Sequence, residues 1–240
     1  MKKASLKKFA LGASFFIAMA AASTTAAESG EYLAGDFHQH TYYTDGSHVF
    51  AEHMAENNMR LDWWANSEHG GERNRDGEGH YWDDPTYYPE NPILGDVELS
   101  GGHQEMWRWQ SLRDYVYPDI LEARALYQDK TIINGLEWYP PGHEHCSTAI
   151  HQFDGTATAM SQFAFQFDGS LVDICRVDEP SAFGPFDTLQ KIKGKVYPNG
   201  YNIGVYSKPT EEQKLDSIEA VKYMESLVDS KIAEAWVIPA

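Results

Sequence analysis

The sequence predicts an α/β fold with a metal site at one edge of its sheet, and three observations support this prediction. Short apolar or β-branched stretches at 33–40, 61–66 and 131–136 alternate with helical sequence along the chain. Polar residues gather at or just past the end of each stretch, where α/β folds usually place their chemistry. These polar residues are histidines accompanied by aspartate or glutamate, a ligand set suited to divalent transition metals.

The first half of the chain is expected to alternate strand and helix. A strand near 33–40 precedes a helix from about His48 to Asn58, with Ser47 as its N-cap. A second strand covers 61–66. The stretch 70–102 mixes aromatic residues with Gly, Pro and Asp, which predicts an irregular insertion. Helical sequence then runs over 103–128, with an interruption near Pro118.

The second half continues the alternation. Strands are expected at 131–136 and 147–153, and a second insertion of mixed structure at 154–208. Thr210 and Gln213 form a capping-box pattern that begins a helix. We expect its apolar residues to share one face: Leu215, Ile218, Val221, Tyr223 and Leu227. After a final strand at 234–238, the order implies parallel βαβ units in one domain of about 210 residues.

The N-terminus has the features of a secretory signal. Four lysines precede an apolar stretch at 9–22, and small residues surround Ala26 and Ala27. We expect a signal peptide at 1–27, a domain at 28–240 and a periplasmic or secreted protein, with a retained anchor as the alternative. Removing four lysines and no acid takes the net charge from −17 to −21, which disfavours nucleic acid and anionic membranes as partners. A small substrate fits this charge better.

The run GDFHQHTYYTDG contains the strongest metal-binding pattern. His38 and His40 project from the same face of an extended strand, and Asp45 can return from the following loop. Glu68 and His69 follow the second strand. Glu137, with His143 and His145 shortly after it, follows the third.

These residues resemble the motifs of the PHP (polymerase and histidinol phosphatase) family. HxHT followed by a Thr-Asp-Gly turn matches 38–46, an acidic residue before histidine matches 68–69, and Gly-x-Glu matches 135–137. The next family histidine fits His145 best, with His143 as the alternate. The resemblance covers roughly 35–150, and the family more often has Asp where this chain has Glu68.

The resemblance implies a distorted seven-stranded, TIM-like (β/α)7 barrel that hydrolyses phosphate esters with two or three Zn, Mn or Fe ions. It implies metal ligands at His38, His40, Asp45, Glu68, His69, Glu137 and His145. Within that set, Asp45, His69 and Glu137 would be catalytic, and Glu137 would bridge two ions. A metal-activated water would attack a small phosphorylated substrate. The alternatives are a metal-holding protein without turnover, or a hydrolase of other esters or amides.

Later family motifs, His-Pro and Asp/Asn-x-His, have no counterpart, because no histidine follows His151. We therefore expect a C-terminally incomplete chain, with a complete shortened protein as the alternative. His103, Arg73, Arg75 and His143 are weaker candidates for substrate binding, since arginine forms bidentate pairs with phosphate. Cys146 and Cys175 are compatible with a disulfide, and a structural role is favoured over a zinc thiolate.

Overall fold

The computed structural model of the protein describes residues 32–54, 59–69, 74–94, 99–141, 145–168 and 209–239. Three strands form a parallel sheet in the order β1-β2-β5. They are β1 (Gly35–Gln39), β2 (Trp63–Asn66) and β5 (Thr131–Ile133). This sheet confirms the parallel arrangement expected for the first half of the chain.

A second sheet, in the order β6-β7-β8, is antiparallel throughout. Its strands are β6 (Gly135–Trp138), β7 (Cys146–Gln152) and β8 (Ala233–Pro239). The expectation of parallel βαβ units was wrong here. The link between β6 and β7 is too short for the crossover that a parallel pair requires, so the chain turns back on itself.

The two sheets meet along the bent segment formed by β5, Asn134 and β6. Beyond the bend, the Glu137 amide donates to the Ser67 carbonyl and the Ile150 amide donates to the Asn134 carbonyl, both at 3.2 Å. A Cβ atom on Gly135 would lie 2.1 Å from the carbonyl oxygen of Asn66, so glycine permits this close approach. The expected single strand at 131–136 is therefore two strands in different sheets.

Apolar side chains cover both faces of the sheets. One face carries a small cluster of Ala65, Ile133 and Ala149, and Phe37 of β1 meets Trp236 of β8 there at 6.3 Å between ring centroids. Among the described strands, β1 and β8 each have a partner on one side only. The described pairing thus closes no barrel, and the TIM-like barrel stays a prediction.

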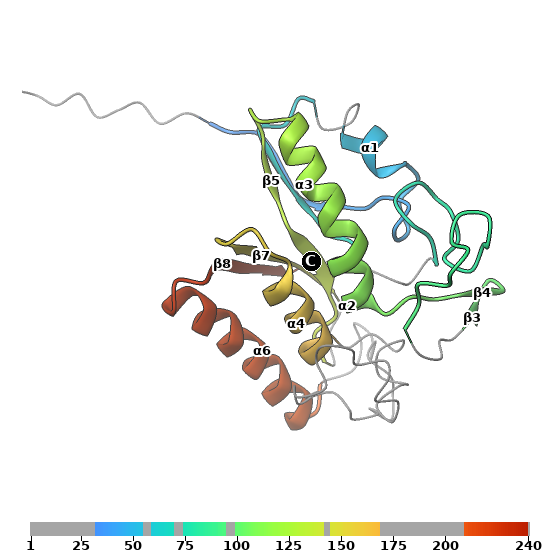
Figure 1. Cartoon of the computed structure of the whole chain (residues 1–240). Helices are drawn as coiled ribbons and strands as arrows, with labels where there is room; N and C mark the ends of the chain where they lie inside the picture. Colours follow the sequence, from blue (N-terminus) through green and yellow to red (C-terminus); the bar gives the residue numbers. More distant parts are fainter. Residues whose placement is uncertain are drawn as a thin grey trace, which may run out of the picture. The chain divides into compact units, whose positions relative to one another are not determined.

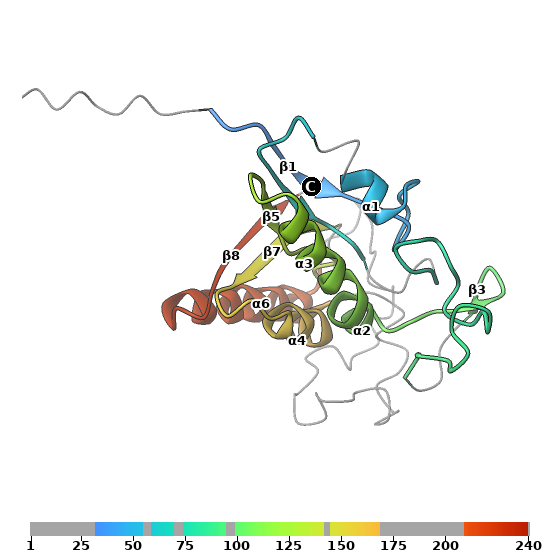
Figure 2. The same ribbon diagram turned by 45° about the horizontal axis from the view of Figure 1, so that its top comes forward.

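Helices pack against the opposite face, where the larger core lies (Figures 1 and 2). They are α2 (Arg108–Ser111), α3 (Tyr117–Leu126), α4 (Thr158–Phe167) and α6 (Glu211–Asp229). The capping box of Thr210 and Gln213 is confirmed. The predicted apolar face of α6 is confirmed for Leu227, which is buried, and for Tyr223, which packs against the core. It was wrong for Leu215, Ile218 and Val221, which are exposed, and the other buried residues are Gln213, Asp216, Ala220 and Met224.

Two other helix predictions need correction. Helix α1 begins at Phe50 and spans Phe50–Glu52, and Ser47 does not cap it. The His48 carbonyl instead accepts the Tyr42 amide, which keeps this part of the chain in the preceding loop. The helical stretch predicted at 103–128 begins at Arg108, and its irregularity is a π-helical turn at Leu112–Val116, ahead of Pro118 in the first turn of α3.

The insertion 70–102 lacks long regular elements in its described part, as expected. It ends in a hairpin of β3 (Leu99–Ser100) and β4 (His103–Gln104), so His103 lies in a strand and not at a helix start. Trp82 of the insertion is fully buried in the main core. No helix within the described residues is both long and apolar enough to span a membrane. The predicted signal peptide lies outside the described residues.

Candidate metal centre

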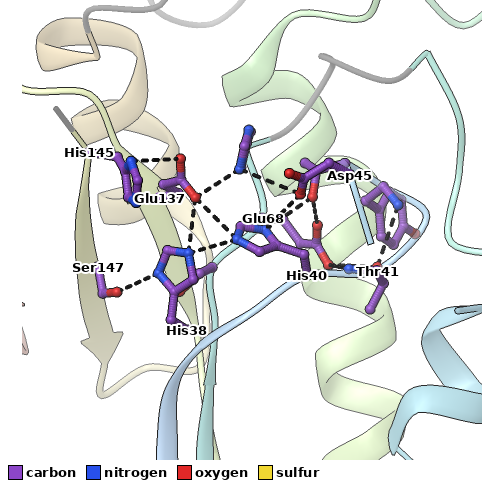
Figure 3. Close-up of polar contacts among 12 residues, drawn as sticks. His38, His40, Thr41, Asp45, Glu68, Glu137, His145 and Ser147 are labelled. Atoms are coloured by element: carbon purple, nitrogen blue, oxygen red, sulfur yellow. Dashed lines mark hydrogen bonds and ion pairs between the residues drawn. The ribbon is translucent and has the colours of Figure 1, made fainter. Parts of the chain in front are cut away.

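Five residues from four segments of the chain meet where the two sheets join. His38 lies on β1 and His40 directly follows it, His69 comes after β2, Glu137 lies on β6, and His145 immediately precedes β7. Figure 3 shows the side chains of His38, His40 and His145 pointing toward the carboxylate of Glu137. The structure thus brings together residues that are up to about a hundred positions apart in the sequence.

One oxygen of Glu137 is the point of convergence. The Nε2 atoms of His38 and His40 each lie 3.1 Å from Glu137 Oε2, and His69 Nε2 lies 2.9 Å from it. His145 approaches the other oxygen, with its Nδ1 3.8 Å from Oε1. Glu137 is almost completely buried, so few water molecules can compete for its oxygens.

These residues form two ligand groups that share Glu137. One group is His38, Glu137 and His145, and the other is His40, His69 and Glu137. Within each group the ligand atoms lie within 4.8 Å of one another, close enough to bind a metal ion. The chemistry of the donors fits this use, because imidazole and carboxylate together suit transition metals.

The second ring nitrogens of His38 and His40 have oxygen partners, an arrangement that favours metal binding. His38 Nδ1 lies 2.7 Å from Ser147 Oγ, and His40 Nδ1 lies 3.3 Å from Thr44 Oγ1. Metal-binding histidines usually donate their other ring N–H to an oxygen in this way. The Nε2 atoms of His38 and His40 lie 2.8 Å apart, a separation that suits a hydrogen bond between them.

The histidines determine the charge state of Glu137. Burial alone would raise the pKa of its carboxyl, but hydrogen bonds from His38, His40 and His69 outweigh burial and hold the pKa well below its ordinary value.

Arg108 of α2 positions the backbone of Glu137. It donates a hydrogen bond to the Glu137 carbonyl at 3.2 Å. Arg108 also pairs with buried Asp168 at 3.1 Å, so this one side chain links α2 both to β6 and to the end of α4.

Asp45 lies at the solvent-exposed side of the centre. Its Oδ1 is 3.6 Å from His40 Nδ1 and 4.0 Å from His69 Nε2, and its side chain is 47% exposed. The loop that carries it is tight, because a Cβ atom on Gly46 would lie 2.3 Å from the His40 carbonyl oxygen. Asp45 is therefore placed beside the second ligand group and open to solvent.

Glu68 was predicted as a ligand, but its carboxylate belongs to neither group. Its Oε1 accepts hydrogen bonds from the Thr41 amide at 2.7 Å and the Thr41 hydroxyl at 2.6 Å, and its Oε2 accepts one from Thr44 at 2.5 Å. The side chain is fully buried. Burial raises the pKa of Glu68, while the bonds from the two threonines act in the opposite direction.

The weaker substrate-binding candidates lie apart from this cluster or outside the described residues. The His103 ring stacks on Tyr81 at 3.4 Å, and its Nδ1 lies 2.9 Å from Asp83 Oδ1. The Arg75 guanidinium lies 4.9 Å from the centre of the Tyr42 ring. Arg73, His143 and Cys175 lie outside the described residues.

Sequence reasoning missed the residues that orient the ligands: Ser147, Thr44 and Arg108. Ser147 could have been found from strand alternation, because it lies two positions after His145 and shares its side of the chain. Arg108 gave no such signal, since it lies on a helix next to the insertion. None of the protein-family models, curated proteins or solved structures compared with this chain matches it, so the resemblance to the PHP family rests on the motif residues alone.

Proposed function

We propose that this protein is a metal-dependent hydrolase of phosphate esters with a centre of two ions that share Glu137. The observation that carries the proposal is the convergence of three histidine Nε2 atoms on one buried carboxylate oxygen. A site that held a single proton would not need three imidazoles directed at it. The other oxygen of Glu137 faces His145, so a second ion has its own donors.

The chain's own residues bind and orient. His38 and His145 would hold one ion, and His40 and His69 the other, with Asp45 completing the exposed side of the second position. Bound ions would supply positive charge to the oxygens of an in-line phosphoryl displacement and would lower the pKa of water. Asp45, whose exposed carboxylate lies 4.0 Å from His69, would hold a water molecule at the second position.

The substrate is expected to be small and to approach from the solvent side of Asp45. The strongly negative net charge disfavours a long polyanion, whereas bound cations would neutralise Asp45 and Glu137 locally. Zn, Mn and Fe all suit the donors. We also propose a periplasmic or secreted location. The N-terminal sequence pattern is the observation that supports it.

The test combines elemental analysis with a substrate panel. The purified chain, supplied in turn with Zn, Mn and Fe, is assayed on p-nitrophenyl phosphate, bis-p-nitrophenyl phosphate and p-nitrophenyl acetate, beside Glu137→Gln. Metal-dependent release from a phosphate ester that Glu137→Gln abolishes would support the proposal. Bound metal with no turnover would favour a metal-holding protein, and turnover of the acetate alone would favour another class of ester.

A further inference from the structure

Glu68 is a buried carboxylate beside the centre that belongs to neither ligand group found among the described residues. Its two oxygens accept three hydrogen bonds, all from the loop that joins His40 to Asp45. The residue after it in the chain is His69. Glu68 therefore joins the loop between His40 and Asp45, through its hydrogen bonds, to His69, its neighbour in the chain.

The contact with Thr44 constrains the neighbouring imidazole. A hydroxyl group carries one hydrogen, and Thr44 gives it to Glu68 Oε2 at 2.5 Å. Toward His40 Nδ1, 3.3 Å away, Thr44 can then offer only a lone pair. The other group near this nitrogen is the Asp45 carboxylate at 3.6 Å, which when ionised is also an acceptor.

Both neighbours of His40 Nδ1 thus favour a proton on that nitrogen. The Nε2 atom, whose lone pair a metal ion needs, lies 3.1 Å from Glu137 Oε2, which in the absence of metal favours a proton on Nε2 instead. Only an unprotonated ring nitrogen can bind a metal ion. We infer that Glu68 is a positioning residue that acts through Thr44 to hold His40 in its metal-binding tautomer. This inference rests on the proposed metal centre.

Glutamine at position 68 cannot reproduce this arrangement. An amide has one oxygen and one NH₂ group, so it can accept from Thr41 or from Thr44 but presents donors to the other. If the NH₂ group faces Thr44, the threonine hydrogen turns toward His40 Nδ1 and favours the wrong tautomer. If it faces Thr41, it meets an amide that can only donate.

The experiment uses two readouts on the full chain. Co²⁺ titration followed by visible absorption measures metal affinity, and long-range ¹H–¹⁵N correlation on histidine-labelled protein without metal shows which nitrogen of His40 carries the proton. We expect Glu68→Gln and Thr44→Val to weaken Co²⁺ binding by roughly 10- to 100-fold, as loss of outer-shell partners does. Both variants should lower the fraction of His40 in the Nδ1–H form relative to wild type. Thr44→Ser keeps the hydroxyl group and should behave like wild type.

Asp76→Asn is the matched control. Asp76 is also buried and also orders a loop, accepting from the amides of Glu78 and His80 and from the Tyr88 hydroxyl. It should lower stability without changing Co²⁺ affinity or the His40 tautomer.

The outcomes separate this inference from the proposed function. Wild-type Co²⁺ affinity and an unchanged His40 tautomer in Thr44→Val would overturn the inference, whether or not Glu68→Gln folds. Absence of Co²⁺ binding by the wild-type chain would overturn the proposed function, while the tautomer measurement would still decide whether Glu68 controls His40.

Discussion

The candidate metal centre and the insertion use the same residue types in opposite ways. In the described part of the insertion and its hairpin, His80 pairs with Asp76 at 3.2 Å and His103 with Asp83 at 2.9 Å. Each of these rings also stacks on a tyrosine, at 3.6 Å and 3.4 Å. In the centre, one carboxylate oxygen instead receives three imidazole nitrogens.

This difference shows that composition does not identify a site. Histidine and aspartate occur together in both regions, but in the insertion each carboxylate holds one ring and the ring packs on an aromatic neighbour. Such a pair is complete without a ligand. In the centre three ring nitrogens meet one carboxylate oxygen, and a cation placed among them would bind the lone pairs of all four atoms.

The largest effect is expected at Glu137. Glu137→Gln removes the charge shared by both ligand groups, so metal affinity should fall by more than the roughly 100-fold typical of outer-shell changes. Elemental analysis after dialysis and Co²⁺ titration measure this. Asp83→Asn, the equivalent change in the insertion, should leave metal content unaltered. Equal metal content in wild type and Glu137→Gln would show that Glu137, like the carboxylates of the insertion, does not bind metal.

His145→Ala should reduce metal binding at one of the two positions only. His145 faces Glu137 Oε1 alone, so we expect the stoichiometry to fall by about one ion per chain while the group around His40 keeps its metal. His151→Ala is the control, because His151 contacts Arg124 and lies in neither ligand group. A metal loss with His151→Ala and none with His145→Ala would contradict the assignment.

Asp119 accepts a hydrogen bond from Tyr43, in the loop that follows His40, and lies near Glu78 of the insertion. Its protonation makes the stability of the protein depend on pH. Burial raises the pKa of Asp119 to about 6, with the nearby charges of Glu122 and Glu78 adding to the effect and the bond from Tyr43 opposing it. Between its ordinary pKa and about 6 the native state binds more protons, so stability falls as pH rises through this range.

The expected penalty above pH 6 is on the order of 1–2 kcal/mol, reduced by solvent screening. Asp119→Asn should flatten the difference in urea-unfolding free energy between pH 4 and pH 7, with little change in metal affinity. Parallel stability profiles for wild type and Asp119→Asn would disprove the raised pKa.

The smallest effect is expected at His103. His103→Ala removes a partly exposed ion pair and a ring stack, which together stabilise a protein by about 1 kcal/mol. Urea unfolding should show that loss, and Co²⁺ affinity should match wild type. Reduced metal affinity in this variant would mean that the hairpin contributes to the centre, and the contrast between the two regions would fail.

Sequence pattern predicted the positions of the ligands better than the connections between strands. The spacing of His38 and His40, the capping box at Thr210 and the final strand all follow from local rules, and the structure agrees with them. The bend at Asn134 was not predicted, because the β-branched residues 131–133 were extended into Leu136, although the Asn134-Gly135 pair is typical of turns. The buried face of α6 also escaped prediction, since tertiary contacts bury Gln213 and Asp216 in preference to Leu215.

Glu68 shows a second limit of sequence reasoning. An acidic residue before a histidine at a strand end is typical of a ligand pair, and only the positions of Thr41 and Thr44 show where its oxygens go. Side-chain direction in a loop is not fixed by strand alternation. The identity of hydrogen-bond partners across the loop therefore had to come from the structure.

The bend between β5 and β6 has a consequence for how this protein can vary in evolution. Leu136 and Trp138 pack into the core on either side of Glu137, whose carboxylate points the other way. Deleting or adding a single residue in 131–138 would exchange these faces and bury the carboxylate among apolar side chains. Length changes should therefore accumulate in the insertion, whose loops tolerate them, and be absent from this segment in related chains.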